Sequence, residues 1–115
     1  MSKYTINEAA SYPQQPDVVQ QAAVAAIEAL GGKVDKKKTT SGHVEAKLDK
    51  KMRGKVIGDR NQLTLELQAG DEGCQVALTA YPLDPIERPL TFGARAGATR
   101  TAVDYFLEEL NQRLG

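Results

Sequence analysis

The 115-residue sequence contains one cysteine, one histidine and no tryptophan, and aromatic residues make up only 5% of it. With Cys74 as the only cysteine, an intramolecular disulfide is excluded. Histidine and cysteine alone cannot supply the three or four ligands of a zinc site. No apolar run approaches the roughly 18 residues that span a bilayer. The N-terminus has no recognisable leader, and with the lone cysteine this favours a cytoplasmic protein.

The sequence also lacks a net charge, because 15 Lys and Arg residues balance 15 Asp and Glu residues. This balance excludes a protein that is held to nucleic acid by its overall charge. Hydrophobic residues at 41% and charged residues at 26% are ordinary for a globular domain. The length fits a single α+β domain over residues 1–115, large enough to bury one core without disulfides or metal.

The first part of the chain has the pattern of a strand followed by a helix. Residues 3–8 alternate as a short strand does. A proline-containing break follows, and Pro16 with Asp17 suits a helix start, because proline tolerates the first turn and a carboxylate stabilises the helix dipole. Apolar residues then recur at helical spacing until two glycines supply a C-cap. We therefore predict a helix over residues 16–30.

Several strand-like segments come after this helix. Residues 33–39 predict an edge strand guarded by lysines, and residues 43–48 alternate between apolar and polar side chains. The charged segment 49–57 is either one bulged strand or two short strands. Residues 63–68 and 74–81 alternate most clearly, so they predict an antiparallel hairpin with one buried face.

The end of the chain predicts a loop with three prolines over residues 82–92 and a second helix over residues 94–114. The whole pattern predicts an α+β fold with the order β-α-β-β-β-β-α. A curved antiparallel sheet of four to six strands would carry the N-terminal helix and the long C-terminal helix on one face. The other face of the sheet is predicted to be polar or half covered, because polar residues of the alternating strands, Thr64, Glu66, Gln75 and Thr79, point there.

Several segments together resemble a group of small bacterial proteins, many of them uncharacterised. They include the helix end "EALGGKV", the hairpin "DKKKTTSGHVEA", the strand "GDEGCQVALTAYPL" and the closing helix "FGARAGATRTAVDYFLEEL". Those proteins have a helix-grip or TATA-binding-protein-like α+β fold, related in shape to the Bet v 1 and START-like ligand binders. The resemblance implies this fold and a ligand between the sheet and the long helix. It brings no catalytic signature and no functional residue.

No catalytic constellation is visible, so we expect a protein that is not an enzyme and that uses no cofactor or metal. His43 and Glu45 have the spacing of the deaminase H-x-E motif, but the cysteine pair that completes that zinc site is missing. Cys74 opens a strand on the core side, where a small buried hydrophobe is the commonest role of cysteine. The first functional hypothesis is therefore a non-catalytic binding module with a groove between the sheet and the C-terminal helix. It would take a small apolar or amphipathic ligand or a peptide. The predicted lining residues are Leu65, Leu78, Val103 and Phe106.

A second hypothesis rests on the charge distribution. Residues 33–60 contain ten basic and four acidic residues, so this segment would meet phosphate groups, an anionic membrane surface or an acidic partner. The predicted basic patch comprises Lys36, Lys38, Lys47, Lys51, Arg53 and Lys55. Nucleic acid is disfavoured as the partner, because no aromatic side chain interleaves with these lysines. The alternative interpretation is a lysine-guarded edge whose charges are solvated.

Two further hypotheses stay open. A start of the second helix that is rich in glycine and alanine would bind an anion through free backbone N–H groups, or it would simply pack closely against the sheet. The arginines assigned to this anion site are Arg88, Arg95 and Arg100. Alternatively, an exposed edge strand or the second face of the sheet would mediate a homodimer. The residues assigned to that face are Val56, Ile57 and Tyr81.

Overall fold

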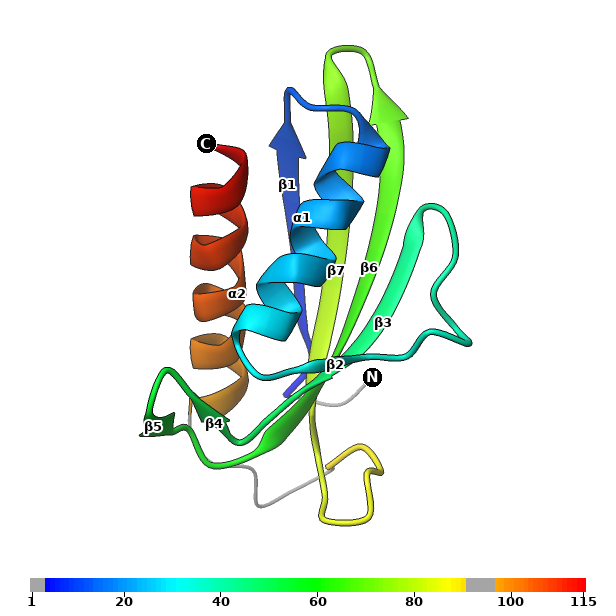
Figure 1. Cartoon of the computed structure of the whole chain (residues 1–115). Coiled ribbons are helices and arrows are strands. Elements are labelled where there is room, and N and C mark those ends of the chain that lie inside the picture. The colour runs from blue at the N-terminus through cyan, green and yellow to red at the C-terminus, as the bar shows by residue number, and fades with distance from the viewer. Residues whose placement is uncertain (1–3, 91–96) are drawn as a thin grey trace.

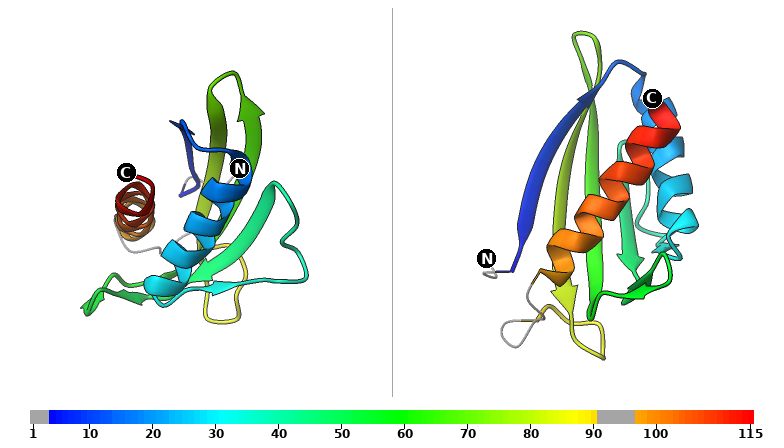
Figure 2. Two further views of the ribbon diagram at one scale, coloured as in Figure 1. Left: turned by 45° about the horizontal axis from the view of Figure 1, so that its top comes forward. Right: turned by 90° about the vertical axis from the view of Figure 1, so that its left-hand side faces the viewer.

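The structure, a computed structural model, describes residues 4–90 and 97–115 of the chain. Its elements are β1 (Ile6–Tyr12), α1 (Pro16–Ala29), β2 (Lys33–Val34), β3 (His43–Leu48), β4 (Lys51–Met52), β5 (Lys55–Val56), β6 (Arg60–Gly70), β7 (Gly73–Leu83) and α2 (Ala98–Leu114). Five strands form one antiparallel sheet in the order β1-β7-β6-β3-β2, and β4 and β5 form a separate hairpin. Both helices cover the same face of the curved sheet (Figures 1 and 2), which confirms the predicted α+β architecture.

Alternation along the strands builds the core, because every second side chain points toward the helices. In β6, Leu63, Leu65 and Leu67 are buried, whereas Glu66 between them is exposed. The helices close this layer with their own apolar stripes, and Phe106 of α2 is the largest fully buried side chain of the described residues. Within residues 4–90 and 97–115, no helix covers the opposite face of the sheet, where polar side chains such as Glu66 and Gln75 are exposed.

Two strands differ from their predicted bounds. β1 lies later than the predicted 3–8, because it pairs with β7 along its full length up to the proline break. β2 is much shorter than the predicted 33–39, because the Asp35 carboxylate bends the chain. Its Oδ1 accepts hydrogen bonds from the backbone N–H groups of Lys37 and Lys38, at 3.1 and 3.3 Å. An aspartate that bonds the backbone two or three residues later makes a turn, and the strand ends there.

The segment 49–57 forms two short strands that leave the main sheet. Arg53 and Gly54 have φ angles of 52° and 76°, and two left-handed residues form the tight turn that suits a two-residue hairpin. Val56 therefore lies in this small hairpin, whereas Tyr81 lies in the five-stranded sheet. The prediction that both belong to one sheet face with Ile57 is corrected, and homodimerisation itself stays a prediction.

The last strand runs through two residues that were predicted to lie in a loop. β7 includes Pro82 and Leu83, and proline fits there because β1 begins at Ile6 opposite Ala80, so that β6 is the strand paired with β7 at Pro82. The connecting loop is described over residues 84–90. The predicted start of the second helix at residues 94–96 lies outside the described residues. Neither helix in the described ranges is both long and apolar enough to span a membrane.

Candidate functional site

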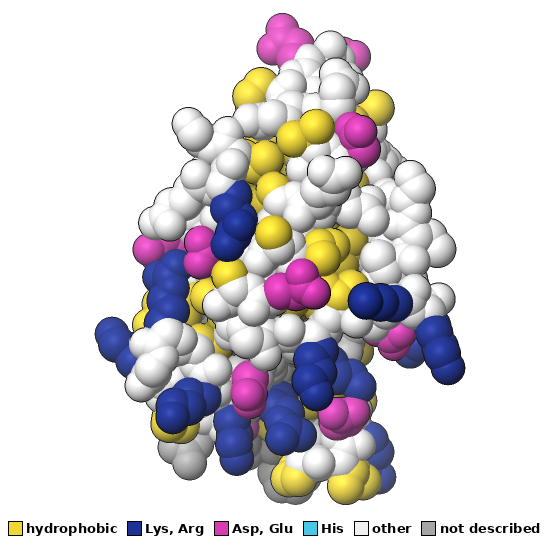
Figure 3. Space-filling model, in the orientation of Figure 1, with side chains coloured by type: hydrophobic (Ala, Val, Ile, Leu, Met, Phe, Trp, Pro, Cys, Tyr) yellow, Lys and Arg dark blue, Asp and Glu magenta, His cyan; other side chains and the backbone are white. Residues whose placement is uncertain are grey.

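Basic side chains gather at one end of the molecule, which we call the lower end. It consists of residues 33–38 around β2, residues 47–60 with the β4–β5 hairpin, and the loop 84–90. These segments lie in the lower half of Figure 1, and Figure 3 shows Lys and Arg side chains concentrated in that half. The basic segment predicted from the sequence thus occupies one end of the fold, together with a loop that the prediction did not include.

Open clefts indent the lower end of the described structure. The first, of about 220 Å³, is lined by Lys33, Lys47, Arg60 and Glu87 among others. The second, of about 230 Å³, shares Lys33, Lys47 and Glu87, and the third, of about 380 Å³, shares Arg60. The first cleft is lined by three cationic and two carboxylate side chains, the second by three of each, and the third by two of each. The clefts are therefore nearly neutral, and none of the three has the excess of cations that a small-anion pocket needs.

The loop 84–90 is fixed to the sheet by an ion pair. Lys47 Nζ on β3 lies 2.7 Å from Glu87 Oε2. The pKa of Glu87 is lowered from its ordinary value, first by the hydrogen bond from Lys47 and then by the charges around it, which include Arg60 and Lys33. Glu87 is thus the carboxylate around which three cations of the lower end are arranged.

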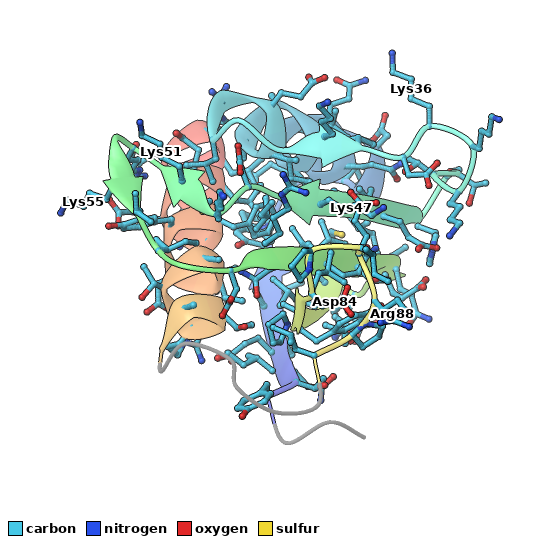
Figure 4. All side chains as sticks on the ribbon, turned by 90° about the horizontal axis from the view of Figure 1, so that it is seen from below. Lys36, Lys47, Lys51, Lys55, Asp84 and Arg88 are labelled. Atoms are coloured by element: carbon cyan, nitrogen blue, oxygen red, sulfur yellow. The ribbon has the colours of Figure 1, made fainter. Side chains whose placement is uncertain are left out.

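Asp84 gives the loop its shape. Its Oδ1 accepts hydrogen bonds from the backbone N–H groups of Ile86 and Arg88, at 3.0 and 2.8 Å, and its Oδ2 lies 3.2 Å from Arg88 Nε. These bonds lower the pKa of Asp84, with the Arg88 N–H contributing most. Figure 4 shows Asp84 and Arg88 side by side in the loop. The turn leaves Ile86 at its tip with 66% of its surface exposed.

Two residues of the predicted basic patch have carboxylate partners. Lys47 is paired with Glu87 as described above. Arg53 Nη1 lies 3.1 Å from Glu108 Oε1, and the Arg53 guanidinium lies 4.8 Å from the ring centre of Tyr105. Both partners of Arg53 belong to α2, so this arginine fastens the hairpin to the helix and has less capacity to bind a further anion.

The other basic residues of this end project into solvent. Lys36 lies on one side of the lower end, and Lys51 and Lys55 lie on the other side, on the hairpin (Figure 4). The exposed lysines that form no ion pair with a carboxylate of residues 4–90 or 97–115 are Lys33, Lys36, Lys37, Lys38, Lys50, Lys51 and Lys55. Lys33, Lys37 and Lys50 belong to the basic segment but lie outside the predicted patch. The place of Lys33 and Lys50 beside the clefts follows only from the folded arrangement.

The predicted groove residues lie together between the sheet and α2. Leu65, Leu78, Val103 and Phe106 belong to one hydrophobic cluster, and each exposes 2% of its surface or less. None of them lines the clefts described here. A ligand at this place would have to separate packed side chains, and the assignment of these residues to a groove stays a prediction.

The predicted anion site around three arginines also stays a prediction. Arg100 Nη1 lies 2.6 Å from Glu8 Oε1, and its Nη2 lies 3.0 Å from Asp104 Oδ1. These carboxylates, Glu8 foremost, raise the pKa of Arg100. The pair with Glu8 joins α2 to β1, whereas Asp104 lies on α2 itself. Arg88 is held by Asp84 in the loop described above, and Arg95 lies outside the described residues. Both described guanidinium groups therefore already have anionic partners within the chain.

His43 and Cys74, whose side chains are the most reactive types in this chain, both have partners or surroundings that suit a structural role. His43 Nε2 lies 2.9 Å from Glu45 Oε2, and its Nδ1 contacts Glu66 Oε1; these two hydrogen bonds, led by that of Glu45, raise the pKa of His43. The Cys74 thiol is buried, and burial raises its pKa, so it is held as the neutral thiol. Within residues 4–90 and 97–115, no cluster of three or more His, Cys, Asp or Glu residues is placed to hold a metal ion.

A larger cleft of about 510 Å³ lies at the opposite, upper end, between the break after β1 and the turn from β6 to β7. Asp71 and Glu72 line it, and no cation does. It is the open space beside two exposed turns, so its size alone does not make it the stronger candidate. The charge and the exposed lysines favour the lower end.

The sequence matches no protein-family model and no curated protein. Among solved structures, a protein from Mesorhizobium loti matches with a TM-score of 0.62 and 14% identity, over 96% of this chain and 96% of that chain. A protein of unknown function from Staphylococcus aureus matches with a TM-score of 0.59 and 9% identity, over 96% of this chain and 92% of that chain. Ara h 8.0201 matches with a TM-score of 0.48 and 12% identity, over 96% and 97%, which is too low a score to support an argument.

These comparisons show the fold alone, because the identities are low. The expected resemblance to small bacterial proteins of this α+β fold is confirmed at that level. The helix-grip arrangement, in which α2 lies across a curved antiparallel sheet, is also confirmed as a description of the fold (Figure 2). The TATA-binding-protein-like description stays a prediction.

Proposed function

We propose that this chain is a non-catalytic binding module whose lower end docks on an extended anionic surface. The observation that carries the proposal is the set of exposed lysines on β2, the turn after it and the β4–β5 hairpin, which form no ion pair within the described residues. Segments that are separate in the sequence place these cations at one end of a chain with no net charge. Concentrated charge of one sign on a neutral protein attracts a partner of opposite sign to that end.

The clefts support a broad surface as the partner more than a small anion. Each cleft holds nearly as many carboxylates as cations, so a phosphate-sized ligand inside it would meet repulsion as well as attraction. Lys36 and Lys55 project from different sides of the lower end, beyond the clefts (Figure 4). Side chains spread in this way can reach charges on a wide surface at the same time, whereas they cannot converge on one small ion.

A groove ligand beneath α2 remains the alternative function. Its predicted lining, including Val103 and Phe106, is packed at 0% exposure, so the groove would open only if α2 moved away from the sheet. The lower end needs no such movement, because its lysines are exposed already. The docking proposal therefore requires no conformational change, whereas the groove proposal requires a movement of α2.

Heparin is a suitable probe, because it is an extended polyanion without bases or lipid. Affinity should fall steeply between about 20 and about 200 mM NaCl, since binding releases counterions. The test variant combines Lys50→Gln, Lys51→Gln and Lys55→Gln. The control variant combines Gln21→Glu, Gln68→Glu and Gln112→Glu, which are exposed positions on α1, near the end of β6 and near the end of α2.

Both variants change the net charge by the same amount, so a difference between them reports the location of the charge. We expect the lysine variant to bind heparin on the order of tenfold more weakly at low salt, with a shallower dependence on salt, because three cationic contacts are lost. The glutamine control should stay within about twofold of the parent protein, since its changes lie far from the lysines. Equal losses in the two variants, or no binding by the parent at low salt, would refute the proposal.

A further inference from the structure

Aliphatic side chains are exposed at the lower end among its lysines. Among the large hydrophobic residues of the described ranges, the two most exposed are Val56, at 71%, and Ile86, at 66%. Val56 belongs to the β4–β5 hairpin and Ile86 to the tip of the loop 84–90. Both segments lie at the lower end in each view of Figures 1 and 2, and hydrophobic surface shows beside the basic side chains at the bottom of Figure 3.

Each exposed side chain belongs to a turn that contacts the rest of the fold. Lys51 and Val56 face each other across the hairpin, while Met52 of the same hairpin is buried with 1% exposure. The loop that carries Ile86 is fixed by the Asp84 hydrogen bonds and by the ion pair of Glu87 with Lys47. Both aliphatic side chains are thus exposed to water by the shape of the turns that carry them.

We infer that the anionic partner is a lipid bilayer, on which the lysines bind the headgroups while Val56 and Ile86 enter the outer edge of the acyl layer. This inference rests on the proposed function and adds the identity of the surface. Each basic residue near an anionic membrane adds to the attraction, and buried aliphatic groups add a contribution that salt does not screen. Cations and aliphatic tips at the same end match the two layers that a bilayer offers, charge outside and hydrocarbon beneath.

Nucleic acid fits the same end less well. Val56 and Ile86 would find no apolar partner on a phosphate backbone, and aromatic residues that stack on bases are scarce in this chain. A protein partner would favour one continuous apolar patch, whereas here two tips come from different segments with charged residues around them. Two separate aliphatic tips among exposed lysines therefore favour a bilayer.

The absence of tryptophan permits a direct test, because each introduced tryptophan would be the only one in the chain. The variants are Val56→Trp, Ile86→Trp and, as the control, Val18→Trp, since Val18 of α1 is 45% exposed but lies outside the lower end. With vesicles of phosphatidylcholine containing about 30% phosphatidylglycerol, we expect emission from the first two variants to shift to shorter wavelength and to be quenched by brominated acyl chains. Emission from the control should stay unchanged.

A second experiment measures the contribution of the tips to binding. The combined variant Val56→Ser and Ile86→Ser keeps every charge, so heparin affinity should stay within about twofold of the parent protein, whereas partitioning onto the anionic vesicles should fall about tenfold. The matched control Val18→Ser should change neither. Vesicle binding that is equal in parent and combined variant, or unshifted emission from both tip variants, would overturn the membrane inference.

The two proposals fail separately. A protein that binds heparin with the expected salt dependence but does not bind anionic vesicles keeps the proposed function and loses the membrane inference. A protein that binds neither probe loses both. Binding to vesicles of pure phosphatidylcholine as strong as to the anionic vesicles also overturns the inference, because the lysines would then contribute nothing.

Discussion

Gly73, at the start of β7, has a φ of 142°, a conformation that residues with a side chain rarely adopt. A Cβ built on it would lie 2.1 Å from the backbone oxygen of Tyr12, so the chain from β1 leaves no space there. Gly54 in the β4–β5 turn also has a positive φ, of 76°, but a Cβ on it would meet no atom within 4 Å. At Gly54 only the backbone conformation disfavours a side chain, whereas at Gly73 the lack of space disfavours it as well.

Substitution at these two glycines should therefore have unequal effects. Gly54→Ala should cost about 1–2 kcal/mol of unfolding free energy, the cost of a left-handed residue with a side chain. Gly73→Ala should cost more, on the order of 3 kcal/mol or above, because backbone must move to admit the methyl group. Urea unfolding of both variants measures the difference, and equal losses would contradict the close approach of β1 to Gly73.

His43 predicts a dependence of stability on pH. Its pKa is raised above the ordinary value of 6.5 in the folded state, first by Glu45 and then by Glu66. A group whose pKa rises on folding stabilises the protein below its unfolded pKa, and the contribution disappears as the pH rises through the folded pKa. The melting temperature of the parent should therefore exceed that of His43→Gln by more at pH about 5.5 than at pH about 9. The same difference at both pH values would show that the two glutamates do not hold a charged imidazole.

At the scale of elements, the β4–β5 hairpin owes its position to contacts with α2. Met52 enters the core cluster, and Arg53 lies over Tyr105 and pairs with Glu108. The main sheet makes no strand pairing with this hairpin within the described residues. The hairpin can therefore loosen while the sheet stays folded.

Arg53→Ala should loosen the hairpin with little effect on the rest. Both members of the Arg53–Glu108 pair are partly exposed, so we expect the unfolding free energy to fall by about 1 kcal/mol or less. Hydrogen exchange should speed up at the Ile57 amide, which donates to the Lys50 carbonyl oxygen at 2.8 Å, and stay slow in the middle of β6. Lys55→Ala on the same hairpin is the control and should change neither rate. Unchanged exchange at Ile57 in the arginine variant would contradict the anchoring role.

The elements also differ in how well the sequence predicts them. The sequence predicts β6 and β7 because buried apolar residues alternate with residues that are mostly polar, and a shift by one residue would turn the apolar side chains to the outer face. The end of β2 was missed because it depends on the Asp35 side chain, and the extent of β1 was missed because it depends on a partner strand far along the chain. Local periodicity does not encode such pairings.

The candidate site could be predicted in part. The excess of lysine in residues 33–60 is visible in composition, and so is the long loop that follows β7. That the loop joins the basic segment depends on the ion pair of Lys47 with Glu87, which are 40 positions apart, and no pattern in the sequence indicates it. The place of Val56 in a separate hairpin was likewise hidden, because the sequence pattern puts it on the second face of the main sheet.

At the scale of the whole molecule, the chain separates its charges along its length. The turn from β6 to β7 places Asp71 and Glu72 at the upper end, and the lysines gather at the lower end (Figure 3). Charge separation of this kind orients a protein of zero net charge in the field of an anionic surface, with the basic end leading. The core between the sheet and the helices is filled by side chains, so the surface carries the proposed activity.

A heparin titration followed residue by residue through backbone amide NMR signals tests this account most directly. The account predicts that signals from residues 33–38, 50–56 and 84–88 shift together and that the shifts disappear at about 200 mM NaCl. Signals from the core beneath α2, including Leu78 and Phe106, should stay in place. Shifts confined to those core residues, or to the turn at 70–75, would contradict the claim that the lower end is the binding surface.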